Sequence, residues 1–176
     1  WQREEKNRDA VQSLLDAITT VRNPGRLVYT AEEILAAVGD AQIVIIDTET
    51  RSLRPHRDGK ILAGCGFRGL DGEGVYLPVR HMDSRNAPVQ ELLTALEALR
   101  GRTLVFHNPK FDLAVFLMEG IDLIEEDVLD TVVLMRLVFE DHVSYDLKEL
   151  GVIHVRSDAK SGETELKALM KRMGWT

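Results

Sequence analysis

Residues 42–47, which read Gln-Ile-Val-Ile-Ile-Asp, constrain the fold more than any other segment of the chain. A run of β-branched apolar residues of this length is typical of a strand that is buried on both faces. Two more strands are predicted over residues 61–67 and 74–78, and the glycines of residues 69–74 between them suit a hairpin turn. These three segments predict a group of adjacent strands within one sheet.

Helices alternate with single strands after this group, as expected for crossover connections. A helix is also predicted before it, where Thr30 and Glu33 have the spacing of a capping box and Gly39 follows as a stop signal. The pattern predicts an α/β fold in which a mixed sheet carries α-helices on its faces. The other predicted elements are strands over residues 27–29 and 103–106, and helices over 3–21, 31–38, 88–99, 110–119, 130–138, 145–150 (capped by Ser144) and 163–173.

The composition excludes several classes of protein. The chain has 176 residues, enough for one domain with a substantial core, and no apolar run reaches the ~20 residues of a membrane helix. Its net charge of −7 argues against a module that holds duplex DNA through bulk positive charge. Because Cys65 is the single cysteine, no internal disulfide can form, which favours a reducing cytoplasm. We therefore expect a cytoplasmic protein without membrane contact.

Two acidic residues, Asp47 and Glu49, stand where the central strand is expected to end. Their spacing directs both side chains to the same face of an extended backbone. Carboxylates held side by side repel each other, and a divalent cation between them removes that repulsion. Taken alone, the pair is equally compatible with two solvated acids in a loop.

A second group of polar residues follows the strand predicted over 103–106. Asn108 and Pro109 predict a tight turn, and Asn108 either fixes that turn or hydrogen-bonds a ligand. Asp112 falls in the first turn of the next helix, where a negative charge is also favoured by the helix dipole. If the two strands are neighbours in the sheet, Asp112 completes a cluster of three carboxylates with Asp47 and Glu49.

Three motifs in this order carry a resemblance to a known family: Asp-Thr-Glu-Thr at 47–50, Gly-Val-Tyr-Leu-Pro-Val-Arg-His at 74–81 and His-Asn-Pro-Lys-Phe-Asp at 107–112. Together they resemble the 3′→5′ exonuclease domain of DNA polymerase I from bacteria and phages. That domain is one of the DEDD exonucleases, which share an RNase H-like fold. The resemblance covers roughly residues 25–150 and implies this fold for the chain.

The resemblance also implies a reaction. Asp47, Glu49 and Asp112 match the residues that bind two Mg²⁺ or Mn²⁺ ions, about 4 Å apart, for phosphodiester hydrolysis. Thr50 and Leu53 match positions that pack against the terminal nucleotide. The implied partners are the 3′ end of single-stranded DNA, a nucleoside monophosphate product and a polymerase whose errors the domain removes.

Further contacts with nucleic acid are predicted from charge. Arg51, Arg54, Arg57 and Lys60 follow the acids closely and form either a phosphate-contacting loop or a solvated one. Lys110 is a weaker candidate for a phosphate contact, and Asn108 matches the polar residue that precedes the second-motif aspartate. His81 and His107 are interpreted as residues of local structure, and Asp130 as the N-cap of a helix.

The chain departs from the family pattern in its last third. The third motif, a Tyr or His followed by a fourth aspartate, has no match. Tyr145 has Glu149 where the motif requires Asp, and the spacing from His142 to Asp146 is one residue too short. We therefore expect the 176 residues to bind metal weakly and to hydrolyse slowly. The predicted organisation is a helical extension over 1–24 and an exonuclease-like domain over 25–176 that lacks the third motif.

Two other functions remain open at this point. An RNA 3′ exonuclease of the ribonuclease D type would use the same acids, because no residue identified so far reads a 2′-hydroxyl group. A non-catalytic module that binds nucleic acid or serves as a scaffold would account for the missing third motif.

Overall fold

The computed structural model describes residues 25–82, 85–141 and 144–155. Residue contacts divide the chain into two compact units, Asn23–Thr131 and a second that comprises Trp1–Arg22 and Val132–Thr176. The helices predicted over residues 3–21 and 163–173 lie outside the described residues. Among the helices that are described, none is long and apolar enough to cross a membrane.

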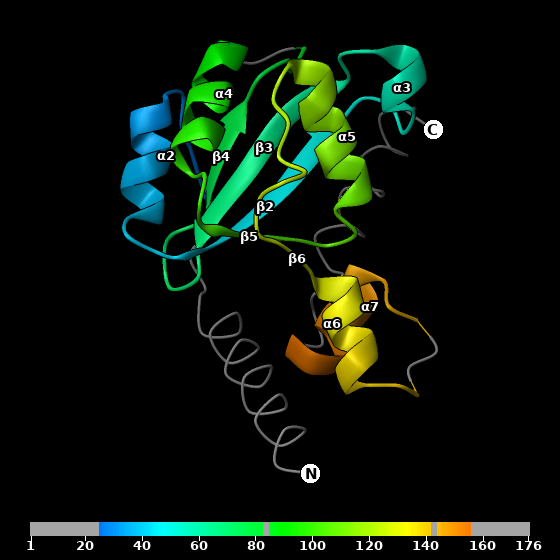
Figure 1. Cartoon of the computed structure of the whole chain (residues 1–176). Coiled ribbons are helices and arrows are strands. Elements are labelled where there is room, and N and C mark those ends of the chain that lie inside the picture. The colour runs from blue at the N-terminus through cyan, green and yellow to red at the C-terminus, as the bar shows by residue number, and fades with distance from the viewer. Residues whose placement is uncertain (1–24, 83–84, 142–143, 156–176) are drawn as a thin grey trace, which may run out of the picture. The chain divides into compact units, whose positions relative to one another are not determined.

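A mixed six-stranded sheet forms the centre of the Asn23–Thr131 unit (Figure 1). The strand order is β1-β4-β3-β2-β5-β6, in which β3 runs antiparallel to β2 and β4 and the other neighbours are parallel. The predicted group of three adjacent strands is therefore confirmed as β2, β3 and β4. The strands are β1 (Arg26–Leu27), β2 (Ile43–Thr50), β3 (Leu62–Gly69), β4 (Val75–Pro78), β5 (Thr103–Phe106) and β6 (Val128–Asp130).

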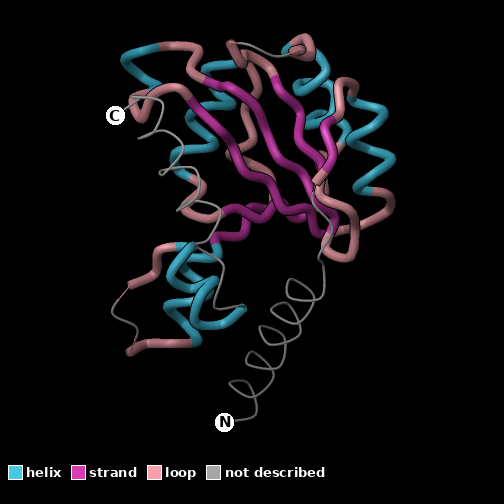
Figure 2. The backbone as a smooth tube through the Cα atoms, turned by 180° about the vertical axis from the view of Figure 1, so that it is seen from behind, coloured by secondary structure: helices cyan, strands magenta, loops and turns pink. Residues whose placement is uncertain are grey.

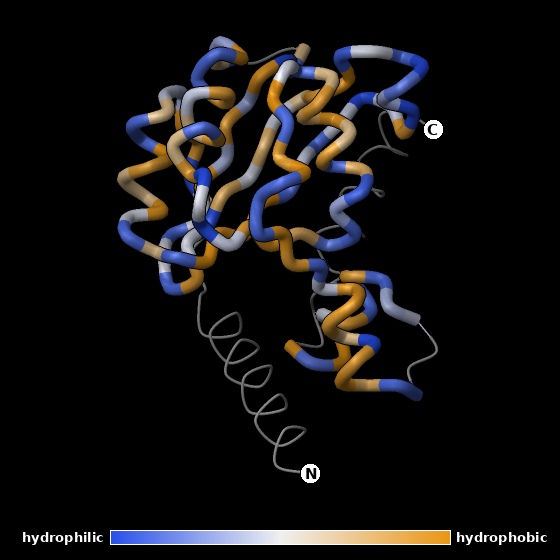
Figure 3. The backbone as a smooth tube through the Cα atoms, viewed as in Figure 1, coloured by the Kyte–Doolittle hydropathy of each residue, from blue (hydrophilic) through white to orange (hydrophobic). Residues whose placement is uncertain are grey.

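The long helices of this unit lie on one face of the sheet, and the view from behind shows the strands uncovered by them (Figure 2). These helices are α2 (Ala31–Val38), α4 (Val89–Ala98) and α5 (Lys110–Glu119). Val44 and Ile46 of β2 point to the helices and share one buried cluster with Ile34, Leu92 and Phe116. Apolar residues occur both along the strands and along the helices that cover them (Figure 3). A short helix, α3 (Pro55–Asp58), contacts α5.

Several boundaries follow the sequence closely because local signals set them. Helix α2 has the predicted bounds, with the Thr30 hydroxyl accepting a hydrogen bond from the Glu33 N–H and the Glu33 carboxylate accepting one from the Thr30 N–H. Strand β5 and helix α5 also have the predicted bounds, and Gly120 ends α5 in the left-handed conformation. The predicted α/β fold with a mixed sheet is confirmed.

Other boundaries differ because strand pairing sets them. Strand β2 continues through Thr50, since β3 pairs with it along its length, and so Asp47 lies within the strand and not beyond its end. Residues 128–130 form β6 beside β5, which corrects the prediction of a helix starting at 130. Asp130 therefore ends a strand, directly before α6 begins at Thr131.

The described residues of the second unit form α6 (Thr131–Val138, of which Thr131 belongs to the first unit), α7 (Leu147–Leu150) and a π-helical turn, η1 (Gly151–Val155). Asp146 caps α7 by accepting hydrogen bonds from the N–H groups of Lys148 and Glu149, so the predicted cap at Ser144 is wrong. The Tyr145 hydroxyl donates to the Phe139 carbonyl at 2.6 Å. Tyr145 and Asp146 thus both support local structure.

Candidate active site

Asp47 and Glu49 occupy alternate positions of β2 and share the face turned away from the helices. Their partners across the β2–β3 ladder are Gly66 and Gly64, which add no side chain beside them. Both acids remain exposed to solvent. The prediction that they lie together on one face of a strand is confirmed.

Asp112 lies in the first turn of α5 and is only 6% exposed. Its Oδ1 atom accepts two hydrogen bonds from Thr48, one from the hydroxyl at 2.6 Å and one from the backbone N–H at 3.2 Å. Thr48 continues the buried series of Val44 and Ile46, so Asp112 approaches β2 from the side of the helices. The third acid is thereby bound to the residue that separates the other two.

The three carboxylates influence one another electrostatically. Loss of hydration raises the pKa of Asp47 above its ordinary value, and the charge of Glu49 raises it further, while His107 opposes this shift. Burial is also the main cause that raises the pKa of Asp112, with an added contribution from Asp47 and with the Thr48 hydrogen bonds acting in the opposite direction. Both acids are therefore costly to hold ionised, and a nearby cation would lower that cost.

These residues fit a hard divalent cation in donor chemistry. Carboxylate oxygens are the ligands that Mg²⁺ and Mn²⁺ prefer. Loss of hydration, with a smaller contribution from a neighbouring carboxylate, raises the pKa of both Asp47 and Asp112, and a bound cation would oppose both effects. Within the part of the chain that the structure describes, no group of three or more His, Cys, Asp or Glu side chains is already arranged to hold a metal ion. This agrees with the position of Asp112. It approaches β2 from the side of the helices, and its Oδ1 atom is hydrogen-bonded to Thr48.

The turn before α5 sets the position of Asp112. Asn108 adopts a positive φ of 64°, a conformation that asparagine tolerates better than most residues, and its N–H donates to Asp130 Oδ1 at 3.1 Å. Pro109 then occupies the N-cap position of α5, with φ −55°. Of the two roles open for Asn108, the structure therefore supports formation of the turn.

His107 lies next to the acids, which the sequence did not predict. Strand β5 runs parallel to β2 with Val105 opposite Ile45, so two residues further His107 is level with Asp47. The Thr131 hydroxyl donates to the Phe106 carbonyl at 3.1 Å and therefore accepts, at 2.9 Å, from the Nδ1–H of His107. The pairing of β2 with β5 places His107 beside the acids. In the sequence, its position directly after the strand predicted over 103–106 was an indication that it lies near the end of that strand.

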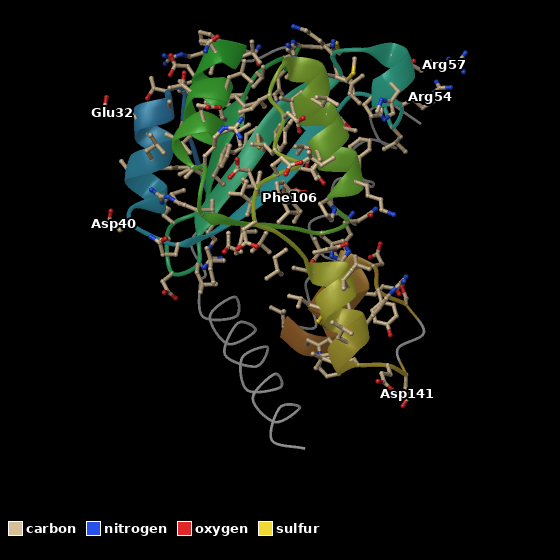
Figure 4. All side chains as sticks on the ribbon, in the orientation of Figure 1. Glu32, Asp40, Arg54, Arg57, Phe106 and Asp141 are labelled. Carbon is tan, nitrogen blue, oxygen red and sulfur yellow. The ribbon has the colours of Figure 1, made fainter. Side chains whose placement is uncertain are left out.

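The predicted nucleic-acid residues follow the acids along the chain or begin α5. Thr50 ends β2, and its hydroxyl donates to the Ser52 carbonyl at 3.0 Å. Arg51 and Leu53 are exposed, Leu53 to 85%, as is Lys110 at the first position of α5. Arg54 and Arg57 project outward at α3 (Figure 4). The segment after the acids thus presents one apolar and several cationic side chains to solvent.

Several solved structures resemble this chain in fold. Brucella melitensis NrnC with bound Mg²⁺ is 27% identical over 73% of this chain and 59% of its own, with a TM-score of 0.54. The same protein bound to pGG is 25% identical over 73% of this chain and 58% of its own, with a TM-score of 0.52. The Aedes aegypti Nibbler EXO domain, 16% identical over 77% of this chain and 71% of its own, shares the fold with a TM-score of 0.56.

The chain therefore spans about 59% of the length of NrnC. No curated protein sequence matches the chain significantly. Residues 28–152, which include β2, the turn at Asn108 and α5, match the 3′-5′ exonuclease domain family. Because this match covers more than half of the chain and the mixed sheet is RNase H-like, the chain belongs to the 3′-5′ exonuclease domain family.

Proposed function

We propose that this protein is a metal-dependent 3′→5′ exonuclease in which Asp47, Glu49 and Asp112 bind the metal. The observation that carries the proposal is the pair of hydrogen bonds from Thr48 to Asp112. These bonds attach the acid of α5 to the residue between the two acids of β2, although the two segments are 64 residues apart. Chance placement of surface acids would not bury Asp112 at this point.

The chain's own residues have separable tasks in this reaction. Two Mg²⁺ or Mn²⁺ ions, when bound, would supply an activated water and neutralise the charge that develops on the leaving 3′ oxygen. Asp47 and Glu49 offer their carboxylates on the face of the sheet that α2, α4 and α5 leave uncovered, which we call the open face. The hydrogen bonds from Thr48 favour the ionised form of Asp112, in opposition to the effect of burial.

The nucleic-acid strand is held by residues beside the acids. Leu53 packs against the terminal base, for which its side chain is available because it is 85% exposed among the described residues. Thr50 lies beside the same nucleotide, and Arg51 and Lys110 neutralise phosphates. Asn108 contributes by fixing the turn between β5 and α5. A local group of cations makes binding possible despite the net charge of −7.

The proposed substrate is the 3′ end of single-stranded DNA, with nucleoside monophosphates as products, and the proposed setting is proofreading beside a cytoplasmic polymerase. A short RNA or oligonucleotide is the second candidate, and the similarity to NrnC bound to pGG favours it. Because the third motif has no match in residues 1–176, we propose that the helical extension over 1–24 and the domain over 25–176 turn over slowly by themselves.

One experiment tests activity and substrate together. Single strands of DNA and RNA with the same sequence and a 5′ label are incubated with Mn²⁺ and the full chain, beside the Asp47→Ala variant. A ladder that shortens from the 3′ end, and that the variant does not produce, supports the proposal. Preference for one strand type selects between the two substrates. Binding of both strands without any shortening at high enzyme concentration would instead support the non-catalytic module.

A further inference from the structure

Tyr76 shares the open face of the sheet with the two exposed acids. Tyr76 of β4 lies opposite Gly66 of β3, and Gly66 lies opposite Asp47 of β2. Residues opposite one another in adjacent strands point to the same face. A phenol, a bare glycine and a carboxylate therefore follow one another across the sheet.

The hydroxyl of Tyr76 leans along the sheet to the level of Glu49. A methyl group placed on Gly64 would lie 2.0 Å from the Tyr76 hydroxyl oxygen, so the hydroxyl rests directly on the backbone of Gly64. Gly64 is the residue opposite Glu49 in the β2–β3 ladder. The pKa of Tyr76 is raised to about 12, first by loss of hydration and then by the charge of Glu49, which agrees with this proximity.

His81 holds the phenol in this position. Its Nε2 atom lies 2.8 Å from the Tyr76 hydroxyl oxygen, and the two rings meet edge to face with centroids 5.7 Å apart. The backbone of His81 is itself fixed by Asn86, whose Oδ1 accepts from the His81 N–H at 2.7 Å and whose Nδ2 donates to the His81 carbonyl at 2.9 Å. The pair is thus ordered, and the imidazole remains exposed to solvent.

The pair retains one hydrogen-bond donor for a ligand whichever tautomer is present. If the Tyr76 hydroxyl donates to Nε2, the imidazole keeps its Nδ1–H; if Nε2–H donates to the hydroxyl oxygen, the phenol keeps its own proton. Among the described residues, none accepts a further hydrogen bond from either group. A donor beside two carboxylates suits an anionic ligand, because the carboxylates alone would repel it.

We propose that Tyr76 and His81 form a phosphate-binding subsite that holds a backbone phosphate of the substrate strand on the Glu49 side of the acids. This inference rests on the proposed nuclease function, since it takes the strand to lie over the open face. The ligand group is a phosphodiester oxygen, which accepts the remaining hydrogen bond of the pair. The subsite would position the strand relative to the acids and would contribute mainly to affinity.

The test measures affinity for a pentathymidylate in which one phosphate at a time is replaced by an uncharged methylphosphonate. All proteins carry Asp112→Asn to prevent cleavage, and Tyr76→Phe and His81→Gln are compared with that parent. We expect about tenfold weaker binding of the unmodified strand by either variant. At one linkage the methylphosphonate should weaken binding by the parent and have no further effect on the variants.

The control variant is Tyr29→Phe, which removes a hydroxyl from a ring that faces Arg85 and not the acids. Its affinity profile should match that of the parent. Two results would overturn the subsite and leave the nuclease function intact. One is that the methylphosphonate lowers the affinity of parent and variants equally at every linkage; the other is that both variants bind the unmodified strand as tightly as the parent does. A parent that binds no strand at all would overturn both proposals.

Discussion

Thr48 donates two hydrogen bonds to a single oxygen of Asp112, from its hydroxyl at 2.6 Å and from its backbone N–H at 3.2 Å. Both bonds lower the pKa of Asp112, whereas burial of the carboxyl raises it. Thr48 therefore favours the ionised form of Asp112. Its side chain is as much a part of the site as the acids on either side of it.

Replacement of Thr48 by valine should weaken metal binding most at low pH. The substitution keeps the shape and removes the hydroxyl donor, so the pKa of Asp112 should rise further and its ionised fraction should fall. We expect about tenfold weaker Mn²⁺ binding at pH 6 and a smaller loss at pH 8, measured by calorimetric titration. Thr103→Val removes a similar bond, to Asp127, and should leave Mn²⁺ affinity unchanged. An equal loss at both pH values would contradict this explanation.

Asp47→Asn should stabilise the metal-free protein at neutral pH. The pKa of Asp47 is raised in the folded state, so the folded protein binds a proton more tightly than the unfolded chain does. Stability is then lost as pH rises from the unfolded to the folded pKa of this group, and the amide avoids that loss. In EDTA, the melting temperature of the variant should exceed that of the parent at pH 7 and equal it at pH 3.

Mn²⁺ should reverse the order of the melting temperatures of the parent and the Asp47→Asn variant. Mn²⁺ should raise the melting temperature of the parent and not that of Asp47→Asn, because binding to the folded state alone is stabilising. Asp40→Asn, at an exposed position after α2, is the matched control and should behave as the parent does (Figure 4). A variant that is less stable than the parent in EDTA at pH 7 would contradict the prediction.

Leu53→Ala should weaken nucleic-acid binding without a change in stability. The side chain is 85% exposed, so its removal leaves no cavity, and the free energy of unfolding should stay within about 0.5 kcal/mol of the parent. Loss of its contact with the terminal base should lower oligonucleotide affinity about tenfold. Ile124→Ala, at a side chain that is 69% exposed between α5 and β6, should change neither quantity. Fluorescence anisotropy and denaturant unfolding provide the two measurements.

Glu119→Gln should destabilise the fold more than any surface ion-pair variant. The Glu119 side chain is 0% exposed and binds Arg80 through both oxygens, at 2.7 and 2.8 Å. The substitution leaves the Arg80 guanidinium without its counter-charge, at a cost of about 3 kcal/mol in urea unfolding. Glu73→Gln removes the exposed partner of Arg26 and should cost less than about 1 kcal/mol. Similar losses for both would show that burial of the Arg80 pair has no effect on its strength.

The local elements and the acid pair could be predicted from the amino-acid sequence because their signals are local. The capping box of Thr30 and Glu33 set the start of α2, and Gly120 set the end of α5. The spacing of Asp47 and Glu49 was sufficient to place both side chains on one face, since side chains alternate along any strand. The position of Asp112 in the first turn of a helix followed from Asn108 and Pro109.

Contacts between distant segments depended on the tertiary structure. Strand β2 extends through Thr50 only because β3 pairs with it, and residues 128–130 are a strand only because β5 lies beside them. The bond from Thr48 to Asp112 and the position of Tyr76 on Gly64 require a particular register between strands and helix. Sequence periodicity fixes which face each side chain occupies but not which residues pair across the sheet, because packing of the whole sheet selects among registers that keep the same faces.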